Sequence, residues 1–371
     1  MRLNVVSFQM PFPANYGGVI DVYFKLKALR EAGVKTTLHT FAYGSRRRDD
    51  RILEVCEAVR YYDRATGIRS QLSTLPYIVK SRQNPELLSR LLADDAPVLL
   101  EGLHCCGFIG RLRDAGKKVA VRIHNVEHDY YRALALKSPQ PVRRLYFDIE
   151  SRRLRRYEHR LADADTLLTI SDADTHHYRR LFPAKNVVNI NPFFDDTDSA
   201  ATGQGKAPEL LYHGNMSVEE NIQAVNFLLD NVIPLTASRP KLTVAGHNAP
   251  DALRLRGADV IADPSDAELD SLVANAVVNI LVTDQPTGMK LKLMKALGKA
   301  RGYCLVNPPM LTDGALAGYC TVADGAVRLA EEIDRMVAHP RSLDESGDAR
   351  RRFLAAYGTA AGAQKIIKAI F

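Results

Sequence analysis

Short apolar runs alternate with amphipathic stretches along almost the whole chain. The runs of strand length form two series, at 3–8, 36–40, 98–101, 119–124 and 166–170, and then at 209–213, 241–245, 260–262, 276–282, 303–307 and 319–322. Helical patterns lie between them, notably at 19–32 and 143–161. This alternation is typical of parallel sheets whose two faces are covered by helices. We therefore predict an α/β protein with two Rossmann-like, doubly wound parallel-sheet domains.

A polar segment separates the two series of strands. Residues 191–205 are rich in Pro, Asp, Ser and Gly and contain few apolar side chains, which is the composition of a linker. We predict an N-terminal domain at 1–194, a linker at 195–207, a C-terminal domain at 208–349 and a helical segment at 350–371 that crosses back to the first domain. Two such domains would face a cleft, and open α/β sheets bind ligands at the carboxyl ends of their strands.

Positive charge is concentrated in the first half of the chain. Residues 1–200 hold 32 lysines and arginines against 24 aspartates and glutamates, a net charge of +8, whereas residues 201–371 hold 18 against 19. An excess of this kind indicates an anionic partner, such as a membrane surface or a phosphorylated acceptor. No nucleic-acid-binding motif accompanies the arginines, so we do not expect a nucleic-acid partner.

The remaining composition favours a cytoplasmic protein, with the inner face of the cell membrane as the alternative location. No apolar run approaches the ~20 residues that a membrane-spanning helix needs, and the apolar stretch at 3–8 is too short for a signal peptide. The five cysteines have no metal-ligand spacing, and their odd number fits reduced thiols.

Three loops at predicted strand ends in the second half carry the same kind of signal. They contain Gly214-Asn215, Gly246, and Thr287-Gly288 followed by Lys290 and Lys292. A helix N-terminus attracts anions through its unpaired N–H groups and its dipole, and a nearby lysine adds a full charge. None of the loops matches a Walker sequence or G-x-G-x-x-G, which disfavours a P-loop enzyme or a dinucleotide dehydrogenase. We expect a nucleotide-diphosphate site.

Two loops of the first half add polar groups at strand ends. Gly17-Gly18 follows the first strand, and His124 stands at the end of the strand at 119–124, followed by Asn125, Glu127 and His128. A His-x-x-x-His pair with a glutamate between resembles a metal site, but it lacks a third ligand and is not H-E-x-x-H. We therefore expect no metal ion.

Taken in order, these motifs resemble the GT-B glycosyltransferases of the family-four (group 1) type. The resemblance rests on Gly17-Gly18, His124, Ser171 after the strand at 166–170, Gly214-Asn215, Ala245-Gly246 and the segment 287–297, and it covers essentially the whole chain. It implies a retaining, metal-independent transfer of a sugar from a nucleotide-diphosphate donor, without a cofactor. It also implies that the second domain binds the nucleotide sugar and that the first binds the acceptor.

The resemblance carries over to individual positions. It assigns His124 and Asp284 to catalysis, with His124 contacting the transferred sugar. Donor-binding positions are Gly17, Gly18, Gly214, Asn215, Gly246, Thr287, Gly288, Lys290, Lys292 and Lys295. Acceptor-binding positions are Asn125, Glu127 and His128.

The chain departs from the family pattern at two places. The family usually has two glutamates about seven residues apart in the loop and helix at 284–297, whereas here the nearest acid is Asp284 and Lys295 stands at the ribose position. The usual arginine after the Gly-Asn turn is replaced by the segment 219–221, Glu-Glu-Asn.

We therefore keep three functional hypotheses. The first is a hexosyltransferase acting on a saccharide or lipid-linked saccharide acceptor in cell-surface polysaccharide or glycoconjugate synthesis, with peripheral contact to an anionic membrane. The second is a nucleotide-sugar epimerase of the same fold. The third is a catalytically inactive sugar-nucleotide-binding subunit.

Overall fold

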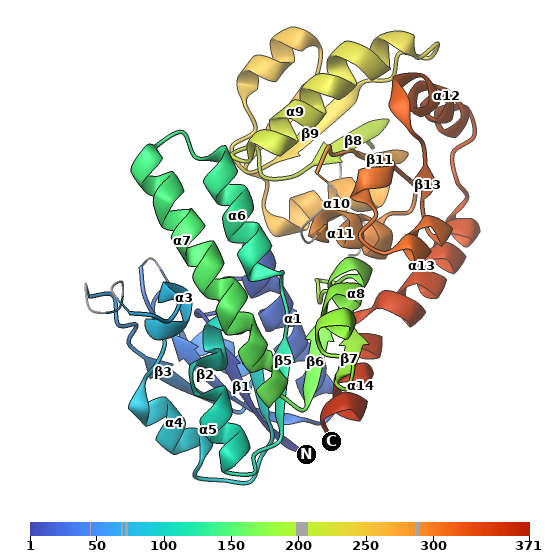
Figure 1. Ribbon diagram of the computed structural model, residues 1–371. Coiled ribbons are helices and arrows are strands. Elements are labelled where there is room, and N and C mark those ends of the chain that lie inside the picture. Colours follow the sequence, from blue (N-terminus) through green and yellow to red (C-terminus); the bar gives the residue numbers. More distant parts are fainter. Residues whose placement is uncertain (45, 68–69, 71–72, 198–206, 286–289) are drawn as a thin grey trace. The chain divides into compact units, whose positions relative to one another are not determined.

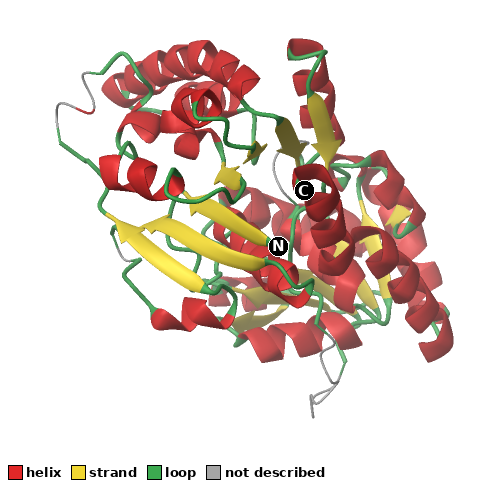
Figure 2. Cartoon of the chain, turned by 90° about the horizontal axis from the view of Figure 1, so that it is seen from below, coloured by secondary structure: helices red, strands yellow, loops and turns green. Residues whose placement is uncertain are grey.

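The computed structural model describes residues 1–371 except 45, 68–69, 71–72, 198–206 and 286–289. The chain divides into two compact units. Unit 1 comprises Met1–Phe193 and Thr359–Phe371, and unit 2 comprises Phe194–Gly358. Each unit contains one sheet in which all neighbouring strands are parallel, with helices packed around it (Figures 1 and 2). The predicted fold class is confirmed.

The sheet of unit 1 has the order β3-β2-β1-β4-β5-β6-β7. Its strands are β1 (Arg2–Ser7), β2 (Lys35–Phe41), β3 (Ala58–Tyr62), β4 (Val98–Glu101), β5 (Val119–Arg122), β6 (Thr166–Thr169) and β7 (Asn186–Asn189). The central strands are buried on both faces, which explains their continuous apolar runs. The strand order reverses between β1 and β4, so the carboxyl ends of these two strands open the crevice in which such sheets bind ligands.

The helices of unit 1 cover both faces of this sheet. They are α1 (Gly17–Glu31), α3 (Tyr77–Lys80), α4 (Pro85–Leu91), α5 (Ile109–Asp114), α6 (Glu127–Lys137), α7 (Pro141–Glu158), α8 (Asp172–Leu181) and α14 (Thr359–Ile370). Short 3₁₀ helices follow β4 (Leu103–Phe108) and α7 (His159–Asp163). The last helix, α14, places Ala363, Ile366 and Ile370 in the same apolar cluster as Phe193.

The sheet of unit 2 has the order β10-β9-β8-β11-β12-β13. Its strands are β8 (Leu210–His213), β9 (Leu242–Gly246), β10 (Asp259–Ala262), β11 (Val278–Leu281), β12 (Tyr303–Val306) and β13 (Thr321–Val322). Its α-helices are α9 (Glu219–Phe227), α10 (Asp266–Asn275), α11 (Leu291–Lys299), α12 (Gly325–Ala338) and α13 (Leu343–Tyr357). Here the order reverses between β8 and β11, and the loops after these strands carry the candidate groups.

None of the helices in the described part of the chain combines the length and the apolar character needed to cross a bilayer.

Candidate functional site

In unit 2, two glycine turns meet at the carboxyl edge of the sheet. Gly214 follows β8, and Gly246 ends β9 with φ of +147°. A Cβ atom at Gly246 would lie 1.9 Å from the carbonyl oxygen of Gly214, so no other residue fits there without moving the backbone. The two turns therefore pack backbone against backbone.

Lys292 lies in the first turn of α11 and is held by neutral oxygens. Its Nζ atom donates to the hydroxyl of Tyr212 and to Oδ1 of Asn221, both at 2.9 Å. Nδ2 of Asn221 in turn donates to the carbonyl of Asn215 at 2.8 Å, which ties this lysine to the predicted turn. Burial lowers the pKa of Lys292 to about 8, although Glu220 opposes the shift. Among the described residues, no carboxylate lies within ion-pair distance of the Lys292 ammonium group.

Lys290 precedes α11 as its N-cap residue and is buried. Its Nζ atom lies 3.5 Å from Oε1 of Glu220, which also accepts the hydroxyl of Thr283 after β11. Burial lowers the pKa of Lys290. The pKa of Glu220 is lowered despite its burial, because Thr283 and both lysines stabilise the carboxylate. Two ammonium groups thus lie near a helix N-terminus with Glu220 as the only carboxylate that pairs with either among the described residues, an excess of positive charge suited to an anion.

The remaining predicted residues of unit 2 are Lys295, Thr287 and Gly288 as donor-binding positions and Asp284 as a catalytic position. Lys295 forms an ion pair with Asp270 of α10 at 2.6 Å, and Lys299 pairs with the same carboxylate. Asp284 is exposed in the loop after β11. The predicted Thr287 and Gly288 lie outside the described residues.

In unit 1, a fully buried ionic network lies beneath the carboxyl ends of β4 and β5. Nζ of Lys25 lies 2.8 Å from Asp21 and 2.8 Å from Glu101, while Arg122 contacts Asp21 at 2.9 Å. All four side chains have no solvent exposure. Desolvation would raise the pKa of Asp21, but Arg122 and Lys25 outweigh it, so the pKa is lowered and the carboxylate is charged. Two acids and two bases give the network a balanced charge.

His124 rests on this network. Its Nε2 atom lies 3.0 Å from Glu101, and since a carboxylate only accepts, Nε2 is the donor. Its Nδ1 atom has no hydrogen-bond partner among the described residues, and the edge of the ring packs near Phe8. Glu101 therefore orients the imidazole, whose buried Nδ1 atom lies 4.0 Å from the carboxylate of Asp21.

The side chains of Asp21, Glu101 and His124 bring their ligand atoms within 4.8 Å of one another, which resembles a metal site. Both carboxylates, however, are already paired with Lys25 and Arg122. A divalent cation would have to displace a buried ammonium and would unbalance the network. These residues do not fit a metal ion.

The predicted acceptor residues separate into two environments. Glu127 begins α6, is 5% exposed and has a pKa raised to about 7 by desolvation, against the opposing effects of Arg82 and Asn125. It is therefore poised to exchange a proton near neutral pH. Nδ1 of His128 instead lies 3.3 Å from Oε2 of Glu158, and this contact raises the pKa of the histidine. The pair joins α6 to the end of α7.

Gly17 and Gly18 form the N-terminus of α1. A Cβ atom at Gly18 would lie 2.9 Å from the ring of Phe8, so the absence of a side chain lets α1 start close to the end of β1.

Sequence reasoning missed several residues that position these groups. They are Asp21, Lys25, Glu101 and Arg122 in unit 1, and Tyr212, Glu220 and Asn221 in unit 2. Two signals were present: Arg122 interrupts an apolar strand, and Asp21 and Lys25 stand four residues apart on one helix.

Comparisons with known proteins identify similar chains. No protein-family model matches. An uncharacterised 44.6 kDa protein in the cps region of Klebsiella pneumoniae is 27% identical over 319 residues, which are 80% of each chain.

Solved structures resemble the chain over its whole length. Sucrose-phosphate synthase from Thermosynechococcus elongatus has a TM-score of 0.66 at 15% identity, covering 99% of this chain and 98% of the other. Trehalose-6-phosphate synthase from E. coli bound with UDP-2-fluoro glucose has a TM-score of 0.64 at 12% identity, covering 100% and 99%. A trehalose-phosphate synthase from Burkholderia xenovorans in complex with glucose-6-phosphate has a TM-score of 0.63 at 12% identity, covering 100% of both chains. The predicted GT-B fold is confirmed.

Proposed function

We propose that this chain of GT-B fold is a hexosyltransferase that moves a sugar from a nucleoside-diphosphate donor to a saccharide or lipid-linked saccharide acceptor in cell-surface polysaccharide or glycoconjugate synthesis. The observation that carries the proposal is the pair Lys290 and Lys292 beside the N-terminus of α11, since Lys290 pairs with Glu220 while Lys292 is held only by neutral oxygens. The similar structures with a UDP-sugar analogue and with a sugar phosphate support it, as does the relative from a cps region.

The reaction would break the bond between the anomeric carbon and the diphosphate oxygen and form a bond from that carbon to an acceptor hydroxyl oxygen. The departing diphosphate gains negative charge, which Lys290 and Lys292 would stabilise more strongly in the transition state than in the ground state. We propose that this stabilisation replaces a metal ion and that the anomeric configuration is retained. The hydroxyl proton would pass to the leaving phosphate oxygen, and Asp284 remains a candidate for contact with the reacting sugar.

The test is incubation with a panel of nucleotide sugars, with release of the nucleoside diphosphate measured in the presence and absence of saccharide acceptors. Acceptor-dependent release supports a transferase, and the anomeric configuration of the isolated product shows retention or inversion. Conversion of the sugar without net transfer identifies an epimerase, and binding without turnover identifies an inactive subunit.

Replacing His124 with alanine is expected to lower turnover by about tenfold or more, because the contact to the transferred sugar that the resemblance assigns to this imidazole would be lost. The affinity for free nucleoside diphosphate, measured by calorimetry, should stay within about twofold of wild type. Glu101→Gln is the companion variant, since it removes the charge that orients His124 and should reduce turnover by a smaller factor. An equal loss of turnover and nucleotide affinity in His124→Ala would contradict the assigned role.

The second expected partner is an anionic membrane surface, and the structure offers one element for it. Helices α6 and α7 lie side by side as a hairpin in unit 1 (Figure 1). Around its turn, residues 132–146 contain four lysines and arginines and no acidic residue. The apolar side chains of Leu136, Val142 and Leu145 are 68%, 83% and 60% exposed. Apolar side chains beside cations suit the interface of an anionic bilayer.

We expect Leu136→Ser with Leu145→Ser to reduce sedimentation with phosphatidylglycerol vesicles severalfold at low salt, because each change removes apolar area from the interface. The matched control is Leu255→Ser in unit 2, a leucine that is 91% exposed. Binding of the wild type should fall as salt rises and should be weak with neutral phosphatidylcholine vesicles. A wild-type protein that ignores anionic vesicles at low salt would show that the acceptor is not reached at a membrane.

A further inference from the structure

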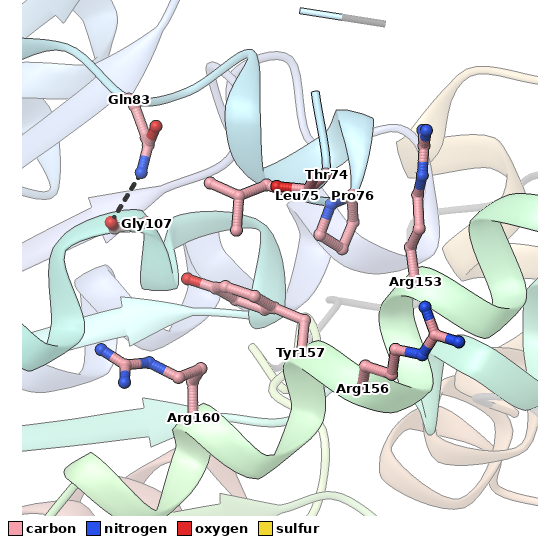
Figure 3. Close-up of a pocket in the computed structure, with 9 residues that line it drawn as sticks. All are labelled: Thr74, Leu75, Pro76, Gln83, Gly107, Arg153, Arg156, Tyr157 and Arg160. Carbon is pink, nitrogen blue, oxygen red and sulfur yellow. Dashed lines mark hydrogen bonds between the residues drawn. The ribbon is translucent and has the colours of Figure 1, made fainter. Parts of the chain in front are cut away.

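A polar pocket lies in unit 1, lined by the C-terminal part of α7 and the 3₁₀ helix after it, the loop before α3, Gln83 and the 3₁₀ helix after β4. Its volume is about 420 Å³, within the usual range of small-molecule sites. Tyr157 forms one wall opposite Leu75 and Pro76, with Arg160 on one side of the ring and Arg153 and Arg156 on the other (Figure 3). None of its lining residues belongs to the ionic network of Asp21 and Glu101 or to the lysine pair of unit 2.

The pocket carries an excess of positive charge. Its described lining residues include no carboxylate. Arg153 pairs with the buried Glu150 at 2.7 Å, and Arg160 lies 3.3 Å from Asp163, a carboxylate that also pairs with Arg113.

Arg156 has no acidic side chain within ion-pair distance among the described residues. It is an exposed residue of α7 that lines the pocket. The three lining guanidinium groups are therefore only partly neutralised, and at least one is available to an anion.

Two glycines make room for the lining side chains. A Cβ atom at Gly107 would lie 2.8 Å from Cγ of Gln83, and one at Gly110 would lie 2.5 Å from the guanidinium of Arg160. Neither Gly107 nor Gly110 has a positive φ. Lack of space for a side chain, and not backbone conformation, therefore explains why glycine stands at these two positions. Gln83 is further fixed by donating to the carbonyl of Gly107 at 2.9 Å (Figure 3). The walls are thus held in place before any ligand arrives.

Tyr157 is fixed in the same way. Its hydroxyl donates to the carbonyl of Cys106 at 2.8 Å, so the polar end of the side chain is already satisfied. What the residue offers to the pocket is the flat face of its ring, opposite the apolar side chains of Leu75 and Pro76. An aromatic face of this kind accommodates the C–H face of a sugar ring, while arginine forks bind phosphate oxygens in pairs.

We propose that this pocket binds a sugar that carries a phosphate monoester, with the ring against Tyr157 and the phosphate at the arginines. The site is separate from the donor-binding lysines and does not depend on the proposed transfer reaction. Two sources share the phosphate monoester, namely a free sugar phosphate and the phosphate headgroup of a lipid, and only the first also supplies the sugar ring.

The experiment measures binding of glucose 1-phosphate by calorimetry, with glucose as the neutral probe. It uses the full chain carrying Lys290→Ala and Lys292→Ala, so that the probe cannot occupy the donor site. In this background, Arg156→Gln is expected to weaken binding about tenfold, because it removes a charge-assisted contact. Arg156→Lys, which keeps the charge but loses the fork, should weaken it less. The matched control is Arg155→Gln, an exposed arginine of the same helix outside the pocket.

A second arm separates the two sources, using vesicles that contain phosphatidic acid in place of the soluble probe. Binding of glucose 1-phosphate that depends on Arg156 and not on Arg155 supports the proposal, whereas Arg156-dependent binding of phosphatidic acid alone would assign the pocket to a lipid phosphate and overturn it. If neither probe binds, or if Arg155→Gln and Arg156→Gln weaken binding equally, the proposal is wrong. Binding of glucose 1-phosphate that the lysine changes alone abolish would assign the probe to the donor site and would also overturn the proposal.

Discussion

Replacing both Lys290 and Lys292 with alanine is expected to weaken binding of the preferred nucleoside diphosphate by about a hundredfold. Each lysine would lose one charge-assisted contact worth roughly 1.5–3 kcal/mol, and a loss of 1.4 kcal/mol is tenfold in affinity. The change also leaves Glu220 without its lysine partner, facing the phosphates with a like charge. Calorimetry with UDP and the other common nucleoside diphosphates provides the measurement.

The control for this variant is Lys241→Ala. Lys241 is an exposed lysine of unit 2 that pairs with Asp259 at the surface, so its removal should leave the affinity within about twofold of wild type. If the double variant binds nucleoside diphosphates as tightly as wild type, the donor site has been misplaced.

The pH dependence of binding offers an independent check on Lys292. Its pKa of about 8 in the free protein lies below the ordinary value of 10.5, so the ammonium is fully present below pH 7 and is lost as the pH rises through 8. Nucleotide affinity of the wild type should therefore fall between pH 7 and pH 9. The single variant Lys292→Ala should show a weaker dependence over the same range, and an equal fall in both proteins would assign the titration to another group.

Replacing Asp21 with alanine is expected to destabilise unit 1 by about 3–5 kcal/mol, the usual cost of removing one partner from a buried ion pair. The substitution would leave Arg122 and Lys25 as buried cations opposed by Glu101 alone, and it would remove the acceptor of the Phe193 backbone N–H. Urea unfolding of the full chain, followed by a probe in unit 1, measures the effect.

The matched control for this prediction is Asp114→Ala. Asp114 is a 66% exposed aspartate that pairs with Arg113 at the surface of unit 1, and such pairs contribute about 0–1 kcal/mol. A loss of under 1 kcal/mol in Asp21→Ala would mean that the network contributes little to the stability of unit 1. Since the folded-state pKa values of Asp21 and Glu101 are lowered, their stabilisation should be present above about pH 4 and decline as the pH falls below it.

The fold class could be predicted from the local pattern of apolar residues in the sequence. Buried parallel strands need apolar side chains on both faces, so each left a short apolar run that the sequence shows directly. Two strands escaped prediction, β3 (Ala58–Tyr62) and β7 (Asn186–Asn189). Both lie at the edges of the sheet of unit 1 and carry partly exposed positions, so neither has a continuous apolar run.

The candidate site was predictable only in part. Glycine turns and lysines near a helix start are local features, which is why Gly214, Gly246, Lys290 and Lys292 could be proposed from the sequence. The environment of a side chain is not local. The family resemblance assigns Lys295 to donor binding. In the structure, its ammonium group forms an ion pair with Asp270 on the neighbouring helix.

By itself, therefore, the sequence determined the alternation of strands and helices, the turns at the strand ends and the residue types available there. The tertiary structure decided which charges meet. Lys25 and Glu101 are 76 positions apart, Arg122 and Asp21 are 101 apart, and Lys292 and Tyr212 are 80 apart. These contacts exist because β1 pairs with β4 and β8 pairs with β11, and strand order is set by burial over the whole sheet rather than by any segment alone.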